Sequence, residues 1–182
     1  MFQWCYLFIL LLVSIFLSTV LPHAQAEENA TPLDSSAQQC NKSTLPWKSM
    51  QQGHIVLLLE HGKQHALTVK LAKHRNEIMA GYQYLCPEII KKSAILFDFG
   101  TAVTSRFHMR NVFAPLDIAF FSADGELINT AKMEPELSKA SGKNKLYAAH
   151  GPYRYALETP AGMLSSAELI PGATRLVITA QQ

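Results

Sequence analysis

The stretch that decides the fold reads FHMRNVFAPLDIAFF, residues 107–121, and consists of two apolar runs that each carry a few polar residues. A short segment with Pro115 separates the two runs, and proline is tolerated at the start of a strand but not in its middle. The pattern therefore predicts two short strands, 106–110 and 115–121, folded against each other as a hairpin. Polar groups held along such a buried seam are typical of a binding site.

Strand periodicity predicts which polar side chains of this hairpin meet. Successive side chains of a strand point to opposite faces, so His108 and Arg110 share a face, and a hairpin can bring Arg110 close to Asp117. One interpretation is a half-buried ion pair that anchors the hairpin. The other is a binding site in which Arg110 and Asn111 donate hydrogen bonds to an anionic or amide ligand while Asp117 orients Arg110.

Three further polar residues admit both a structural and a functional interpretation. His108 is either a packing residue or an acid or base that acts near neutral pH. Asn111 is suited to turning the chain toward Pro115, because its side chain can bond the backbone. Glu158 stands just before Pro160, and it either caps the turn that follows or takes part in catalysis.

On both sides of the central stretch the chain is a succession of short apolar runs separated by Gly and Pro turns. A change of period predicts one helix within residues 73–85, and a second short helix is expected before residue 167. The pattern predicts a mainly β (α+β) fold, a compact antiparallel barrel-like or sandwich-like domain with one or two short helices. The other expected strands are 55–59, 65–72, 93–99, 126–133, 146–149, 154–158 and 174–180.

Length and charge restrict the possible functions. The chain has 182 residues, enough for one domain with a sizeable core, and a formal net charge of only +2, which does not indicate a nucleic-acid partner. It contains no Gly-x-Ser-x-Gly, no HExxH and no glycine-rich phosphate loop. We therefore assign no catalytic residue, no metal ligand and no cofactor from sequence.

The N-terminus indicates export. Residues 6–20 form a nearly unbroken apolar run, and Ala24-Gln25-Ala26 supplies the small residues of a cleavage site. We predict a signal peptide over residues 1–26, a flexible polar arm over 27–46 and a single domain over 47–182. The expected location is periplasmic or secreted, without a membrane span once the signal is cleaved; the alternative is an uncleaved N-terminal membrane anchor that faces the periplasm.

Removal of the signal leaves two cysteines, Cys40 and Cys86. In an exported protein such a pair can be oxidised to a disulfide, which would tie the polar arm to the middle of the domain. The alternative is two unrelated thiols.

At this point the chain resembles the DUF192 family of small bacterial and archaeal proteins, over about residues 67–178. The resemblance rests on an ordered series of motifs: Leu71-Ala72, Ile95-Leu96-Phe97, residues 107–112, residues 115–120 and residues 157–162. The resemblance implies a compact, largely β fold. Members of this family often carry an export signal, and the family has no established function. The chain departs from the family pattern at His108, where tryptophan is usual, and at Arg110, where lysine is usual.

The sequence favours a non-enzymatic binding or interaction module of the cell envelope, with a groove beside the predicted hairpin as its site. The alternatives are a small hydrolase or transferase that uses Asp117 or Glu158 with His108, and a structural accessory protein of the envelope. The expected partner is an unidentified small ligand or an envelope protein. The candidate ligand-binding residues are Arg110, Asn111, Asp117, His108 and Glu158.

Overall fold

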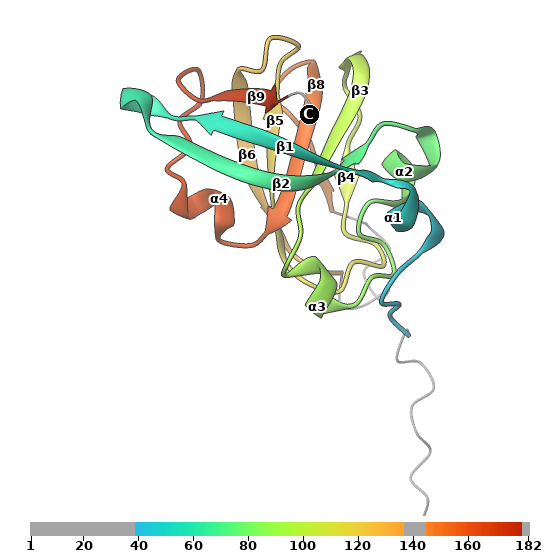
Figure 1. Ribbon diagram of the computed structural model, residues 1–182. Helices are drawn as coiled ribbons and strands as arrows, with labels where there is room; N and C mark the ends of the chain where they lie inside the picture. Colours follow the sequence, from blue (N-terminus) through green and yellow to red (C-terminus); the bar gives the residue numbers. More distant parts are fainter. Residues whose placement is uncertain (1–38, 137–144, 180–182) are drawn as a thin grey trace, which may run out of the picture. The chain divides into compact units, whose positions relative to one another are not determined.

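The structure is a computed structural model that describes residues 39–136 and 145–179. Within these ranges the fold is mainly β with short helices, as the sequence predicts (Figure 1). The strands are β1 (Gln51–Leu58), β2 (Gln64–Ala72), β3 (Ile95–Val103), β4 (Phe107–His108), β5 (Leu116–Phe121), β6 (Leu127–Met133), β7 (Leu146–Tyr147), β8 (Tyr153–Pro160) and β9 (Arg175–Thr179). The helices are α1 (Leu45–Ser49), α2 (Arg75–Ala80), α3 (Pro87–Ile90) and α4 (Met163–Ser166), with a 3-10 turn at Glu60–Gly62.

Seven strands form one mixed sheet in the order β6-β5-β8-β3-β2-β1-β9, and β4 pairs with β7 in a small second sheet. Most pairs are antiparallel, as predicted, but β2 and β3 run parallel because the segment with α2 and α3 returns the chain to the same end of the sheet. The large sheet is not closed into a barrel. Its two edges meet at one corner, where Glu126 and Arg175 form an isolated bridge.

The central strands are buried on both faces, and all six residues of β5 are buried. Side chains of a strand alternate between faces, so neighbouring residues enter different cores. In β5, Ile118 and Phe120 belong to one hydrophobic cluster, whereas Ala119 and Phe121 belong to another. We call these the first and second core.

The predicted hairpin between residues 106–110 and 115–121 is wrong. β4 pairs with β7, and β5 lies between β6 and β8. The physical reason is that β5 is apolar on both faces and is stable only in the middle of a sheet, with a paired strand on each side. The ring of Phe107 in β4 instead packs edge-on against Phe97, with centroids 5.2 Å apart.

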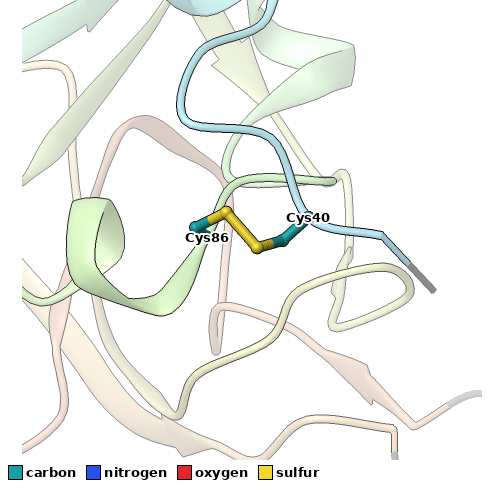
Figure 2. Close-up of a disulfide and its surroundings, with 2 residues drawn as sticks. All are labelled: Cys40 and Cys86. Carbon is teal, nitrogen blue, oxygen red and sulfur yellow. A yellow bond between two sulfur atoms is a disulfide. The ribbon is translucent and has the colours of Figure 1, made fainter. Parts of the chain in front are cut away.

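The N-terminal part of the described chain is linked to the domain by a disulfide and by backbone pairing. Cys40 and Cys86 form a disulfide (Figure 2), and Asn41 pairs with Leu85 as an isolated bridge. Of the arm predicted over 27–46, the described residues 39–46 are therefore tied to the domain, and α1 begins at Leu45.

The predicted signal peptide over residues 1–26 and the alternative membrane anchor lie outside the described residues. Of the helices that the structure does describe, none has the length and apolar character needed to cross a membrane.

The disulfide generates a prediction. It closes a loop of 46 residues, and the loss of unfolded-chain entropy in such a loop corresponds to about 4 kcal/mol. The double variant Cys40→Ser, Cys86→Ser should therefore unfold at a clearly lower denaturant concentration than the oxidised protein. Urea denaturation measures the difference. Reduced wild-type protein is the control and should match the double variant; equal midpoints for all three samples would contradict the prediction.

Candidate functional site

A pocket of about 250 Å³ opens beside the first core. We call it the Glu158 pocket, because Glu158 supplies the one carboxyl group among the residues that line it. Its wall comes from the end of α2 and the turn after it, from β3, and from β4 with the residues before it. The lining residues used below are Gly81, Tyr82, Phe97, Phe99, Phe107 and His108.

Strand register places Glu158 at an apolar position. In β8 it lies opposite Ile95 of β3 and Ile118 of β5, both members of the first core. Its side chain is 5% exposed, and among the described residues it makes no hydrogen bond and no ion pair. Burial without a partner disfavours the charged form and raises the pKa of the Glu158 carboxyl to about 8. At neutral pH this group is therefore a carboxylic acid that faces a cavity.

A glycine keeps the approach to this carboxyl open. Gly81 ends α2 with φ +47°, a conformation that side-chain-bearing residues rarely adopt. A Cβ atom at this position would lie 3.4 Å from Cζ of Phe97 and 3.7 Å from Oε2 of Glu158. A longer side chain would extend over the carboxyl group and fill the pocket.

His108 contributes a second polar atom without a partner. It is half-buried in β4, and its Nδ1 atom is buried and has no hydrogen-bond partner within the described residues. The neighbouring wall is aromatic: the rings of Phe97 and Phe99 both meet Phe107 edge to face, at centroid distances of 5.2 and 6.4 Å. The pocket thus combines an aromatic wall with one carboxyl group that has no partner among the described residues.

Asn111 holds the turn that carries the pocket wall. It adopts φ +60°, its carbonyl oxygen accepts a hydrogen bond from the Tyr84 amide at 2.7 Å, and its Nδ2 donates to Oε1 of Gln83 at 3.3 Å. The sequence places Asn111 among the candidate ligand-binding residues; the structure shows it fixing the loop after α2. Arg110 is exposed and lines neither the Glu158 pocket nor the pocket at Asp117.

Asp117 lies on the opposite face of the sheet from Glu158. It precedes Ile118 in β5, so its side chain points toward the second core, where it lines a separate pocket of about 300 Å³. Its Oδ2 accepts hydrogen bonds from the amides of Gly162 at 2.8 Å and Leu164 at 3.3 Å, at the start of α4. The interaction orders the β8–α4 turn. No ion pair joins Asp117 to Arg110 among the described residues, so the proposed anchoring pair is wrong.

A second buried glutamate, Glu77, differs from Glu158 because its carboxylate accepts three hydrogen bonds. Its Oε2 accepts hydrogen bonds from the amides of Lys73 and His74, both at 3.0 Å, and its Oε1 accepts one from the Ser49 hydroxyl at 2.9 Å. Burial by itself would raise the pKa of Glu77, but these hydrogen bonds outweigh burial and hold it below its ordinary value. Glu77 therefore caps α2 and ties it to α1 as an ion.

Of the sequence candidates, the structure brings His108 and Glu158 into one pocket. Sequence reasoning missed Gly81 and Tyr82 as parts of the site. Tyr82 is fully buried, and burial raises the pKa of its hydroxyl group. A hydrogen bond from the Ser93 hydroxyl lowers this pKa, and the negative charge of nearby Glu158 raises it. A signal for Gly81 existed in the sequence, because a glycine inside a helical pattern often marks close packing or a helix end.

The fold and pocket define a small, mainly β domain with an unpaired acid in an aromatic-walled cavity. The chain belongs to the DUF192 family, described as “Uncharacterized ACR”, whose model matches residues 56–176. No curated protein matches the chain.

Two solved structures are similar to this domain. A protein of Sinorhizobium meliloti 1021, described provisionally as a transcription regulator, has 27% sequence identity and a TM-score of 0.63; the match covers 71% of this chain and 95% of that one. A protein of unknown function from Novosphingobium aromaticivorans DSM 12444 has 22% identity and a TM-score of 0.62, with 77% and 94% covered. The second likeness concerns the fold alone.

The raised pKa of Glu158 predicts a pH-dependent stability. Its pKa is about 8 in the folded protein and 4.5 in an ordinary setting, so the folded state holds a proton that the unfolded state loses between these values. The stabilisation is fully present below about pH 4.5 and is lost as pH rises through about 8, with a slope of about 1.4 kcal/mol per pH unit between these values. Glu158→Gln should remove this slope and melt higher than wild type above pH 8. Melting curves from pH 5 to 9 measure it, and parallel profiles for the two proteins would contradict the prediction.

Glu77 should show the opposite pH dependence of stability, because its pKa is lowered where that of Glu158 is raised. Because Glu77 is ionised and receives three hydrogen bonds, Glu77→Gln should destabilise the fold by about 1–3 kcal/mol near pH 7. Since its pKa is lowered, the wild-type advantage should shrink as pH falls toward and below the ordinary carboxyl range. Chemical denaturation of the variant at pH 7 and pH 4 provides the test, and a loss of equal size at both values would argue against an ionised cap.

Proposed function

We propose that this protein is a small-ligand-binding module of the bacterial cell envelope and that the Glu158 pocket is its binding site. The observation that carries the proposal is the carboxyl group of Glu158: the residue is buried and lines a cavity, and its side chain makes no hydrogen bond or ion pair among the described residues. A buried polar group without a partner costs free energy, and such costs persist mainly where function requires them.

Three features of the pocket favour ligand binding over a purely structural role. Its walls are rings already fixed by mutual edge-to-face packing, so little order is lost on binding. Gly81 leaves the carboxyl group uncovered. Hydrogen bonds from Asn111 to Gln83 and from Tyr84 to Asn111 fix the turn that carries Tyr82 and Gln83, so the cavity is preformed.

The envelope location is supported by two features of different kinds. The sequence has an apolar N-terminal run followed by small residues, and Cys40 and Cys86 are bonded in the folded domain. Disulfides persist in oxidising compartments. The alternative of an uncleaved anchor gives the same exposure of the domain, and N-terminal sequencing of protein from a periplasmic extract separates the two cases.

The proposal is tested by a fragment screen with protein-detected NMR on the full chain. Fragments with an apolar ring and one polar group should shift amide signals of residues 81–83 and 107–108, and Glu158→Gln should weaken the hits at least tenfold. Arg110→Ala is the control, because Arg110 is exposed and lines neither pocket. Hits that cluster elsewhere and are indifferent to Glu158 would overturn the proposal; loss of binding in Arg110→Ala alone would restore the site predicted from sequence.

A second candidate function is a small hydrolase or transferase. The observation in its favour is that Glu158 and His108 face one cavity, and an acid whose pKa is about 8 can donate a proton near neutral pH. In this case a substrate found among the fragment hits would be turned over, and Glu158→Gln would lower kcat with binding retained. Binding without turnover favours the first function.

A further inference from the structure

We infer that the ligand of the Glu158 pocket is a small primary amine, held as its ammonium ion between the Glu158 carboxylate and the aromatic wall. The inference rests on the proposed function and names the chemical class of its ligand.

The pocket holds a carboxyl group whose oxygens have no partner in the described part of the protein. Glu158 is the one carboxyl group among the residues that line the pocket, and no described residue forms an ion pair or hydrogen bond with it. A ligand cation would favour the ionised form of Glu158, because opposite charges attract each other more strongly away from water. An ammonium group has three N–H donors and no acceptor, which matches the two acceptor oxygens of the Glu158 carboxylate.

The aromatic wall of the pocket also favours a cation. Phe97, Phe99 and Phe107 line the pocket, and aromatic faces attract cations as well as apolar groups. The volume of about 250 Å³ lies at the lower end of ligand pockets and suits a body of about one ring or a short chain. A compact amine with an apolar or aromatic body therefore fits both the chemistry and the size.

Other ligand classes fit less well. The titratable and charged groups that face Glu158 across the pocket are Tyr82, Arg106 and His108. Arg106 is exposed, so it lies toward the solvent side rather than beside the buried acid. A ligand carboxylate would have to approach the Glu158 carboxyl group, which works only while that group keeps its proton. A neutral alcohol would leave the ion-pairing capacity of the site unused.

Protonation makes the three classes distinguishable. An alkyl ammonium group keeps its charge up to about pH 10, so it binds the ionised form of Glu158 and expels one proton. Because the pKa of Glu158 is about 8, affinity for an amine should rise about tenfold per pH unit below pH 8 and then level off. A carboxylate or a neutral ligand should show the opposite trend or none.

The experiment is isothermal titration of the full chain with 2-phenylethylamine, 2-phenylethanol and phenylacetate at pH 6, 7 and 8.5. We expect the amine to bind most tightly at pH 8.5, with release of about one proton measured in two buffers of different ionisation enthalpy. Glu158→Gln should lose at least tenfold in affinity for the amine and little for the alcohol. Glu88→Gln is the matched control, since it removes the same charge from an exposed position of α3 outside the pocket.

The outcomes separate the inference from the function on which it rests. If 2-phenylethanol or phenylacetate binds in the pocket as tightly as the amine, or amine affinity does not rise with pH, the amine assignment is wrong and the binding function stands. If none of the three probes perturbs the signals of residues 81–83 at millimolar concentration while fragments bind elsewhere, both are wrong. Equal losses in Glu158→Gln and Glu88→Gln would show a nonspecific charge effect and overturn the inference.

Discussion

Burial of both faces of β5 and of residues 156–159 in β8 sets the architecture of this domain. Side chains in these segments enter the interior on one face or the other, so each polar residue among them needs a structural partner or a cavity. Asp117 and Glu158 occupy adjacent strands one residue out of step, and they satisfy this requirement in different ways. Asp117 finds backbone amides at the start of α4, whereas Glu158 faces a pocket with no partner.

Comparison of the two buried glutamates explains why only one of them defines a site. Both are removed from water, yet three donors converge on Glu77 and hold its pKa low, while burial alone acts on Glu158 and raises its pKa. Burial therefore does not decide the charge state of a carboxyl group in this protein; the number of donors does. An acid left without donors inside a well-packed domain is free to take them from a ligand.

Much of the fold could be predicted from sequence because its strands carry local signals. The run from Ile55 and the alternation before Ala72 fall within β1 and β2, and the expected strands after Asp124 lie close to β6, β8 and β9. The pairing of β4 could not be predicted, since two residues of strand carry no information about their partner and β7 lies far along the chain. The short helices α1 and α3 were missed because four or five residues are too few to show a helical period.

The candidate site was predictable only in part. The sequence singles out His108 within the central stretch and Glu158 before the turn at Pro160, but it gives no distance between them. Arg110 and Asp117 were grouped by strand parity within a hairpin that does not form. The alternation of side chains along the strand is nevertheless correctly predicted, and it places Asp117 on the face opposite Ile118. Because Glu158 pairs with Ile118, Asp117 and Glu158 line different pockets on the two faces of the sheet.

The disulfide has a consequence for the wall of the pocket. Cys86 lies two residues after the turn 81–84, which carries Tyr82 and Gln83, and its bond to Cys40 links this part of the chain to the N-terminal segment (Figure 2). Without this bond, residues 84–86 would be joined to the N-terminal segment by the backbone hydrogen bonds of Asn41 with Tyr84 and Cys86. Reduction of one covalent bond would therefore loosen the pocket wall without altering any residue that lines the pocket.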